Sequence, residues 1–383
     1  MKEGWSYKKL GEVCEVISGQ SPEGKFYNTE GQGTPFYQGK KEFSSKYIGN
    51  PTTWTTVETK IAEKDDLLMS VRAPVGDINF ATQRLCIGRG LAAIRTKEDI
   101  DKEYLFYFLV AQKSCIKGKE GVGFASINRK EIMDIDVQYP KDFSEQHSIV
   151  TRLDAAFSHI DALKANAEKQ LNEARKLFQA ELTECMKPKE GWEEKTLKEV
   201  SEIAGEYGLN ASSKPFDGVR YLRITDITDF GYLNDDKVSA NVEDGKKQDE
   251  LVEGDILFAR TGATVGKTLV YRKDFGDCLF AGYLIRYRLK KDCILPRFIH
   301  YITHSKEYYK WVETNQEAAA QPNISAKKYN MLFIRYPNID VQHRIVSHLD
   351  SLSSTIRKLE ELQQKTLAEC DALKQAMLRE VFE

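Results

Sequence analysis

The stretch ARTGATVGKTLVY (259–271) has the composition of a phosphate-binding loop, whose chemistry would be nucleotide binding. A phosphate loop needs four residues between its first glycine and the Gly-Lys-Thr end. Here Gly262 and Gly266 enclose only three, and Thr261 stands where the first glycine is required. An NTPase that uses Lys267 therefore stays open as one hypothesis, and the rest of the chain must decide it.

Three further patterns could carry chemistry. His300 and His304 have the spacing of a helical metal pair, but Tyr301 stands where a metalloprotease has its glutamate. The chain has no Pro-Pro dipeptide for an amino-methyltransferase motif and no glycine-rich turn for its cofactor. Nuclease-like Glu-x-Lys spacings in PEGK (22–25) and EDGKK (243–247) arise by accident where 30% of residues are charged. We predict no catalytic residue, no metal ion and no cofactor bound by this chain.

Composition sets the class of protein. With 383 residues, 41% of them apolar, the chain is long enough for two or three cores. Neither a signal peptide nor a membrane span is apparent, so we expect a cytoplasmic protein. The seven cysteines are scattered without a Cys-x-x-Cys pair, which indicates reduced thiols. A net charge of −2 does not indicate nucleic-acid binding, so any such surface depends on local clusters.

The positioning elements come from an internal repeat. EGWSYKKLGEV (3–13) returns as EGWEEKTLKEV (190–200), and EKDDLLMSVRAPVG, which ends at Gly76, answers VEGDILFARTGATVG. Further on, FASINRKEI answers QPNISAKKY, and YPKDFSEQHSIVTRLD answers YPNIDVQHRIVSHLD. Each copy is rich in Gly, Tyr, Phe and Thr and then ends in a long stretch without Pro or Gly. The repeat predicts two β-rich domains, each followed by a long helix.

Apolar residues in both terminal stretches recur at steps of three and four, which is typical of a coiled-coil seam. The first seam comprises Val150, Leu153, Phe157, Ile160, Leu163, Ala167, Leu171, Ala174, Phe178, Leu182 and Cys185. The second comprises Val346, Leu349, Ile356, Leu359, Leu367, Cys370, Leu373, Met377 and Val381. Neither helix can bury its stripe alone, so we predict an antiparallel pair with pseudo-twofold symmetry. The stripes either serve only this pair or leave a groove for partner helices.

The duplicated order of these features resembles the specificity subunit of type I restriction-modification systems over essentially the whole chain. The resemblance rests on the Gly-Trp openings, the Gly-x-x-Val-Gly loop and the Gln-x-x-Ile helix entries; the usual Glu-Gln pair becomes Val341 and Gln342 in the second copy. It implies an α+β fold with target-recognition domains at 1–143 and 188–339 and spacer helices at 144–187 and 340–383. Each domain would read one half of a split DNA site. The resemblance also implies two methyltransferase subunits, which use S-adenosylmethionine, and restriction subunits driven by ATP and Mg²⁺.

Candidate DNA-binding residues are polar or aromatic groups on the expected loops, where they can reach phosphates and base edges. In the first domain they are Gln38, Lys40, Lys41, Arg72, Arg89, Lys119 and Ser126. In the second they are Tyr221, Arg223, Thr225, Arg260, Thr261, Thr264, Lys267, Tyr283, Gln321 and Asn323. Gln146, His147, Gln342 and His343 recur at both helix entries, where we expect partner binding or seating of the helix.

These residues leave a rival hypothesis open, in which the chain is a coiled-coil tether whose β-rich domains bind proteins. The first copy of the opening loop weighs against the NTPase, because Asp77 replaces Lys267 and Ile78 replaces Thr268. An acid is not expected in a phosphate cradle. We predict instead that both loops are tight turns that aim Arg72, Arg260 and Thr261 at DNA.

Overall fold

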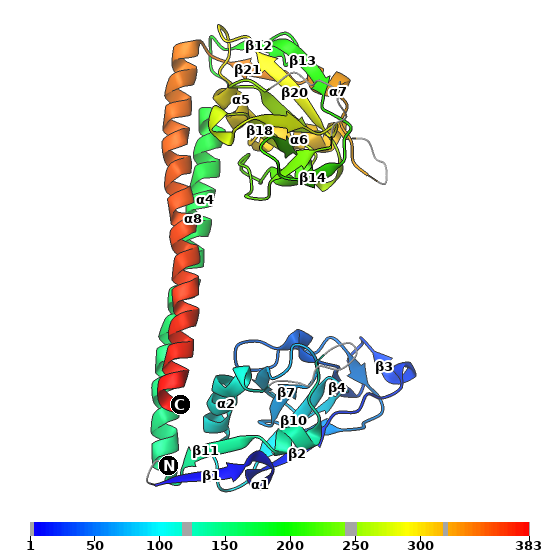
Figure 1. The fold of residues 1–383 in the computed structure, drawn as a ribbon, viewed down its shortest axis with the longest axis vertical. Helices are drawn as coiled ribbons and strands as arrows, with labels where there is room; N and C mark the ends of the chain where they lie inside the picture. The colour runs from blue at the N-terminus through cyan, green and yellow to red at the C-terminus, as the bar shows by residue number, and fades with distance from the viewer. Residues whose placement is uncertain (1–3, 117–124, 242–250, 317–320, 383) are drawn as a thin grey trace. The chain divides into compact units, whose positions relative to one another are not determined.

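The computed structural model describes residues 4–116, 125–241, 251–316 and 321–382 (Figure 1). By its internal contacts the chain divides into two units. The first holds Met1–Ala167 together with Gln364–Glu383, and the second holds Glu168–Gln363. Each unit therefore contains one β-rich domain and a part of each long helix.

In both units the start of the β-rich domain pairs with its end. Strand β1 (Trp5–Lys9) pairs with β11 (Asp136–Pro140), and β12 (Glu193–Thr196) pairs with β21 (Phe333–Tyr336), both antiparallel. In the first pair Trp5 lies opposite Pro140, just before the long helix begins. The repeated Gly-Trp opening thus lies at the start of a strand that closes its domain beside the helix entry.

An antiparallel four-stranded sheet forms the centre of each domain. In the first unit the order is β2 (Cys14–Ser18), β10 (Leu91–Thr96), β7 (Leu67–Ser70) and β8 (Ile78–Phe80). In the second it is β13 (Ser201–Tyr207), β20 (Leu284–Leu289), β17 (Ile256–Ala259) and β18 (Thr268–Val270). Strands β7 and β17 are buried along their whole length, as expected of central strands. The two sheets have the same order, so the repeat is structural as well as sequential.

The smaller sheets distinguish the two units. The first has a five-stranded sheet of β3 (Tyr27–Asn28), β5 (Trp54–Thr55), β4 (Thr34–Tyr37), β9 (Leu85–Ile87) and β6 (Ile61–Ala62). The second has two pairs, β14 (Ser213–Pro215) with β16 (Val238–Ala240), and β15 (Arg220–Leu222) with β19 (Cys278–Phe280). Differences between the domains therefore concentrate away from the shared central sheet.

The short helices correspond between the units only in part. The first unit has α1 (Leu10–Val13), α2 (Lys102–Ala111) and α3 (Arg129–Met133), and the second has α5 (Pro296–Ile302), α6 (Lys306–Asn315) and α7 (Ala326–Asn330). Of these, α2 corresponds to α5 and α3 to α7, whereas the second-unit counterpart of α1, residues 197–200, is a turn. The 3-10 turns in the described part of the chain are η1 (Gly24–Phe26), η2 (Lys40–Glu42), η3 (Gln112–Ser114), η4 (Ile224–Asp226), η5 (Gly262–Thr264) and η6 (Lys273–Phe275). Asp101 begins α2 by accepting hydrogen bonds from the amides of Glu103 and Tyr104, which otherwise lack helical partners.

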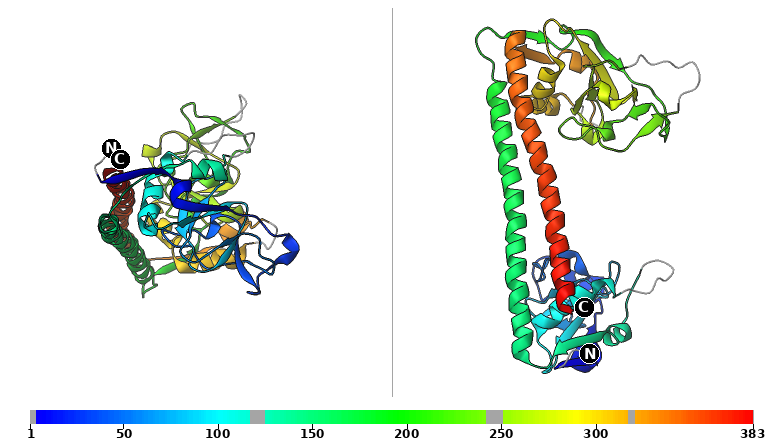
Figure 2. Two further views of the ribbon diagram at one scale, coloured as in Figure 1. Left: turned by 90° about the horizontal axis from the view of Figure 1, so that it is seen from below. Right: turned by 60° about the vertical axis from the view of Figure 1, so that its left-hand side comes forward.

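The two long helices are α4 (Phe143–Cys185) and α8 (Ile339–Phe382), and Figure 2 shows them side by side within each unit. In the first unit Lys374 of α8 forms an ion pair of 2.5 Å with Asp161 of α4. In the second, Arg175 and Glu360 form one of 2.6 Å. Lys164 also pairs with Asp371 in the first unit, and Glu181 contacts His348 in the second. Because the α4 residue numbers rise as their α8 partners' numbers fall in both sets, the pairing within each unit is antiparallel, as predicted. The pseudo-twofold relation between the units stays a prediction.

The predicted seam is wrong at two positions, because Leu163 is 57% exposed and Leu373 is 51% exposed. Near its end α8 turns a different face inward, since Leu378 and Phe382 are each 1% exposed. The Phe382 ring packs edge-on against Tyr104 of α2 at 5.5 Å between centroids. The physical reason is that the β-rich domain itself covers part of each helix, so the buried stripe does not follow the helix pair alone.

Within the described residues, none of the helices combines the length and apolar character that a bilayer crossing requires.

Candidate nucleic-acid interface

The loop that resembles a phosphate cradle is a tight turn between β17 and β18. Its amides are already bonded: that of Gly262 donates to the Pro322 carbonyl at 2.9 Å, and that of Gly266 to the Ala259 carbonyl at 3.0 Å. The amide of Lys267 likewise donates to Thr264 at 3.0 Å, and the Lys267 ammonium forms an ion pair of 2.6 Å with Asp229. A phosphate cradle needs free amides that lead into a helix, so this geometry does not fit one.

Both the backbone conformation and the packing require a glycine at the end of this turn. Gly266 has a φ of +89°, and a Cβ there would lie 2.9 Å from a Val312 methyl of α6. In the first unit Gly76 has the same φ of +89°. Its amide donates to the Ser70 carbonyl at 2.9 Å, which matches the bond from Gly266 to Ala259. The two loops are therefore equivalent turns, as the repeat predicts.

Hydrogen bonds fix which residues of the two turns correspond. The Ile127 amide bonds the Val71 carbonyl at 3.1 Å, and the Ile324 amide bonds the Arg260 carbonyl at 2.9 Å. Arg260 therefore occupies the position of Val71. The bridges Arg72 to Ser126 and Thr261 to Asn323 extend this register, so that Arg72 corresponds to Thr261 and Ser126 to Asn323.

A polar cluster surrounds the turn of the second unit. The Arg260 guanidinium lies 4.9 Å from the centroid of the Tyr207 ring, and its Nε donates to Asn323 Oδ1 at 3.3 Å. The Arg260 amide donates to the carbonyl of Tyr283, whose side chain is 56% exposed. Gln321 is exposed and lies beside Gly262. The cluster thus presents a guanidinium, an amide and an aromatic ring at one edge of the sheet; Thr264, half-buried, is part of the same turn.

The remaining candidates of the second unit lie elsewhere or inside the fold. Tyr221 is 3% exposed, and its hydroxyl donates to the Leu209 carbonyl at 2.7 Å, so it lies in the interior instead of on a reading surface. Thr261 is 8% exposed. The guanidinium of Arg223 is held by Asp226 and Asp236, each at 2.7 Å, and its hydrogen bonds to Asp226 are the main cause of its raised pKa. Thr225 is exposed near this pair.

In the first unit the exposed candidates form two groups. Gln38 Oε1 accepts a hydrogen bond of 2.9 Å from Ser21, and the same Ser21 hydroxyl accepts one of 3.2 Å from the amide of Arg89. Arg72 and Ser126 are both exposed and share a bridge. Lys41 is exposed in η2, and Lys119 lies outside the described residues.

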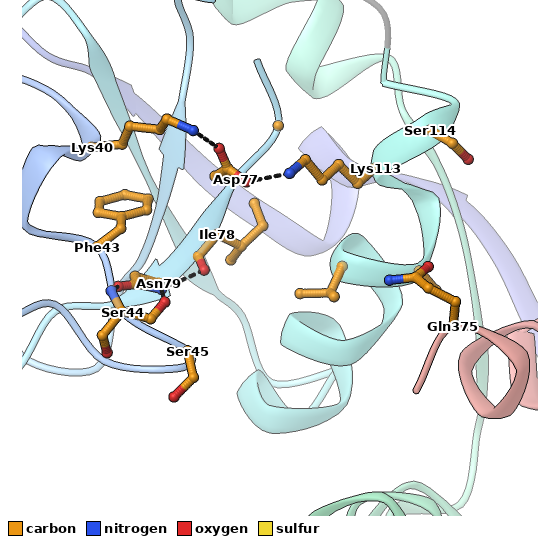
Figure 3. A pocket seen from close by; sticks show the side chains of 13 residues that line it. Lys40, Phe43, Ser44, Ser45, Asp77, Ile78, Asn79, Lys113, Ser114 and Gln375 are labelled. Atoms are coloured by element: carbon orange, nitrogen blue, oxygen red, sulfur yellow. Dashed lines mark hydrogen bonds and ion pairs between the residues drawn. The ribbon is translucent and has the colours of Figure 1, made fainter. Parts of the chain in front are cut away.

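Lys40 lies apart from these groups, in a pocket of about 650 Å³ that also includes Gln375 of α8 (Figure 3). Figure 3 shows Lys40 and Lys113 approaching Asp77 from two sides, and both form ion pairs with it. Burial alone would raise the pKa of Asp77, but the hydrogen bonds from Lys113 and Lys40 outweigh it and lower that pKa. The charge of Lys40 is therefore compensated within the domain.

Both helix entries are fixed by a buried glutamine. Gln146 is 0% exposed; it accepts from the Asp101 amide at 2.8 Å and donates to the Pro140 carbonyl at 2.8 Å. Gln342, also 0% exposed, accepts from the Leu295 amide at 2.9 Å and donates to the carbonyls of Pro337 and Cys293. These bonds join the long helix to the strand before it and to the short helix beside it.

The neighbouring histidines have another environment. His147 is exposed, with Nε2 at 3.3 Å from an Asp101 carboxylate oxygen, and His343 is exposed at the equivalent place. His300 and His304 are mostly buried, and burial is the main cause of their lowered pKa values. His304 Nδ1 contacts the His300 carbonyl at 2.7 Å. That this pair binds no metal stays a prediction.

Sequence reasoning missed Tyr207, on which Arg260 lies, and Lys113, which shares Asp77 with Lys40. The signal for Tyr207 is weak, since it is simply an exposed aromatic residue at the end of β13. Lys113 had no signal, because its contact with Asp77 spans 36 residues.

Comparison with known proteins gives one family. The model of the type I restriction modification DNA specificity domain matches residues 2–173 and again residues 189–368. The putative type I restriction enzyme MjaX specificity subunit of Methanocaldococcus jannaschii is 41% identical over 182 residues, which cover 45% of this chain and 41% of that protein. The chain thus matches only about two-fifths of that relative's length. The type I restriction enzyme StySPI specificity subunit of Salmonella potsdam is 23% identical over 323 residues, which cover 77% of this chain and 68% of that protein.

Two solved structures have the same fold. One, from work on complex assembly and conformational transition of the type I R-M system, has a TM-score of 0.77 at 20% identity and covers all of this chain and 98% of its own. The other, the HsdS subunit of Thermoanaerobacter tengcongensis, has a TM-score of 0.57 at 20% identity and covers all of this chain and 97% of its own. The predicted α+β architecture of two β-rich domains and two long helices is confirmed.

Proposed function

We propose, from the premise that the chain belongs to the type I restriction-modification DNA specificity family, that it is a DNA-sequence specificity subunit without catalytic activity of its own. Each β-rich domain reads one half of a bipartite, asymmetric site. The helices set the spacing of the half-sites and scaffold two methyltransferase subunits and the restriction subunits. S-adenosylmethionine, ATP and Mg²⁺ belong to those partners, and the complex acts in the cytoplasm.

The cluster around Arg260 carries this proposal. An arginine suits the acceptors of guanine and an asparagine suits adenine, while a tyrosine offers a stacking face. Arg260 is oriented by the Tyr207 ring and by Asn323, so its rotamer freedom is reduced before DNA arrives. The arrangement is that of a preorganised group at the end of a buried strand.

Asymmetry of the target follows from the register of the two turns. Where the second unit has Arg260, Tyr283 and Asn323, the first has Val71, Gly90 and Ser126. The first unit instead exposes Arg72 one position later, with Gln38 and Arg89 nearby. Different donors at the same scaffold positions support two different half-sites.

The direct test is methylome sequencing of a host that carries the system, with Arg260→Ala compared with the wild type. We expect a bipartite methylation motif with two unlike halves. A single ungapped motif in the wild type would contradict the proposal.

A binding assay with the methyltransferase complex assigns the halves. Losing a base contact costs about 1–3 kcal/mol, or roughly 5- to 150-fold in affinity, so Arg260→Ala should relax one half-site only. Arg272→Ala is the control, because Arg272 is an exposed arginine of the same domain that pairs with Asp274. A tether whose domains bind proteins predicts no salt-sensitive DNA binding even in the complex.

A further inference from the structure

Of the residues that the structure describes, three with metal-ligating side chains meet where α4 and α8 pair in the second unit. They are Glu181 and Cys185 of α4 and His348 of α8. His348 Nε2 lies 3.0 Å from Glu181 Oε1, and Cys185 Sγ lies 3.7 Å from the same oxygen. All three ligand atoms lie within 4.8 Å of one another.

The helices bring these atoms together for simple reasons. Glu181 and Cys185 are four residues apart, so they lie on one face of α4. The antiparallel pairing places His348 opposite them, and the adjacent Leu182 and Leu349 are each 0% exposed. Two well-packed residues in the seam therefore fix the backbone positions of the three donors.

The separations suit one tetrahedral ion. Zinc bonds to nitrogen, oxygen and sulfur are about 2.0–2.3 Å, which sets ligand atoms roughly 3.4–3.6 Å apart at tetrahedral angles. The observed 3.0 and 3.7 Å lie on either side of that range, so small side-chain rotations suffice. Glu181 and His348 are half-exposed, which leaves a path for the ion and a fourth position for water.

We propose that Glu181, Cys185 and His348 form a binding site for a borderline-soft divalent ion, with Zn²⁺ as the expected occupant, that joins α4 to α8. One thiolate, one imidazole and one carboxylate match zinc and cobalt, whereas magnesium and calcium require oxygen donors. This site is independent of the DNA-reading proposal.

Binding would change the protonation of the site in a definite way. Burial is the main cause of the raised pKa of Cys185, so the thiol holds its proton in the metal-free protein. The metal displaces that proton to solvent and replaces the contact between Glu181 and His348 with two metal bonds. Since the ligands come from two helices, the ion adds a cross-link that the unfolded chain lacks.

Cobalt substitution of the full-length, untagged protein tests the site. Co²⁺ bound to a thiolate gives a ligand-to-metal charge-transfer band and tetrahedral visible bands, and added Zn²⁺ should abolish both. His348→Ala should remove the bands. It should also weaken zinc binding by at least roughly tenfold, because even the loss of a residue that only hydrogen-bonds to a metal ligand weakens binding by about that much. Cys185→Ser should remove the charge-transfer band.

Matched controls are Cys293→Ser and His343→Ala, which alter a partly exposed cysteine and an exposed α8 histidine outside the cluster. Both should keep the wild-type spectrum. Bands that are absent from the wild type, or that persist in His348→Ala, would overturn the proposal. Because His348 is exposed, its variant remains informative even if Cys185→Ser fails to fold.

Discussion

The central sheets of the two β-rich domains share one ion pair and differ in another. Arg95 holds Asp66 through two hydrogen bonds in the first unit, and Arg288 holds Asp255 in the same way in the second. Beside this pair the first sheet has Ala93 opposite Ile17.

At the same register the second sheet has Arg286 opposite Glu206. Arg286 is 0% exposed, hydrogen-bonds Glu206 and lies 3.7 Å from Asp255. The same position of the sheet is therefore filled by an apolar pair in the first domain and by an ion pair with a buried arginine in the second. This fold accepts either pair, provided that both members are apolar or both are charged.

The largest effect should come from breaking this match. Arg286→Met leaves Glu206 and part of Asp255 without their cation, and removal of one partner of a buried pair costs about 3–5 kcal/mol. Hydrogen exchange in urea, read on peptides of the second β-rich domain, measures the loss there.

The double change Arg286→Met with Glu206→Ile restores a matched apolar pair and should recover most of that loss. If the double variant is no more stable than the single one, the charge pair has a role beyond compensation of charge.

A comparable effect is expected at the two buried glutamines. Gln146→Leu and Gln342→Leu leave buried backbone groups without partners, at about 1–3 kcal/mol for each group. Gln342 bonds three groups and Gln146 two, so the second unit should lose more stability. Unfolding midpoints measured by the same exchange experiment compare them.

Controls for the glutamines are His147→Ala and His343→Ala, which alter exposed neighbours and should change stability by less than about 0.5 kcal/mol. A loss of stability in these controls as large as in the glutamine variants would contradict the assignment of the helix seat to Gln146 and Gln342.

The sequence was sufficient for the features that repeat. The duplicated Gln at each helix entry, the long stripes and the glycine turns depend on local spacing. The structure has the glutamines and the turns at the predicted places, and the stripes too except at Leu163, Leu373 and the end of α8. The Tyr107–Asp154 and Tyr301–Asp350 hydrogen bonds, which link the short helix to the long one in each unit, also repeat but were not noticed.

Sequence reasoning failed where contacts between residues far apart in the chain determine the environment of a side chain. Tyr221 is buried because β15 pairs in parallel with β19, 58 residues further on, and no local pattern encodes that pairing. Asp77 compensates the charge of Lys40, and this contact also joins residues that are far apart in the sequence. Leu163 kept the helical period yet stayed exposed, because periodicity does not tell which neighbour covers a helix face.

A further difference between the units is pH-dependent. His300 has a pKa lowered mainly by burial, then by His304 and Arg297, whereas the first unit has Phe106 there. A folded-state pKa below the unfolded value near 6.5 means that the unfolded chain binds the proton more tightly. Stability of the second domain should therefore fall as pH drops below about 6.5, by at most about 1.4 kcal/mol per pH unit for this group.

His300→Phe should flatten that dependence, measured as the urea midpoint of the second domain between pH 7 and pH 5. His159→Ala, an exposed histidine on α4, is the control and should leave the slope unchanged. An unchanged slope in His300→Phe would assign the acid sensitivity to His304, whose pKa is also lowered by burial.

The smallest expected effect concerns the charge at the end of the two turns, where Asp77 corresponds to Lys267. Asp77 compensates Lys40 and Lys113, and Lys267 is itself compensated by Asp229. If these turns face DNA, Asp77→Asn releases two ammonium groups and should steepen the salt dependence of non-specific DNA binding by up to about two phosphate contacts. Lys267→Ala should reduce it by no more than about one contact. The measurement is the affinity of the methyltransferase complex for unrelated duplex DNA across a salt series.

Asp371→Asn, which releases Lys164 on the helix pair, is the control for charge alone. An equal steepening in that control would mean that the effect comes from net charge alone. It would then give no support for a contact between Lys40 and DNA.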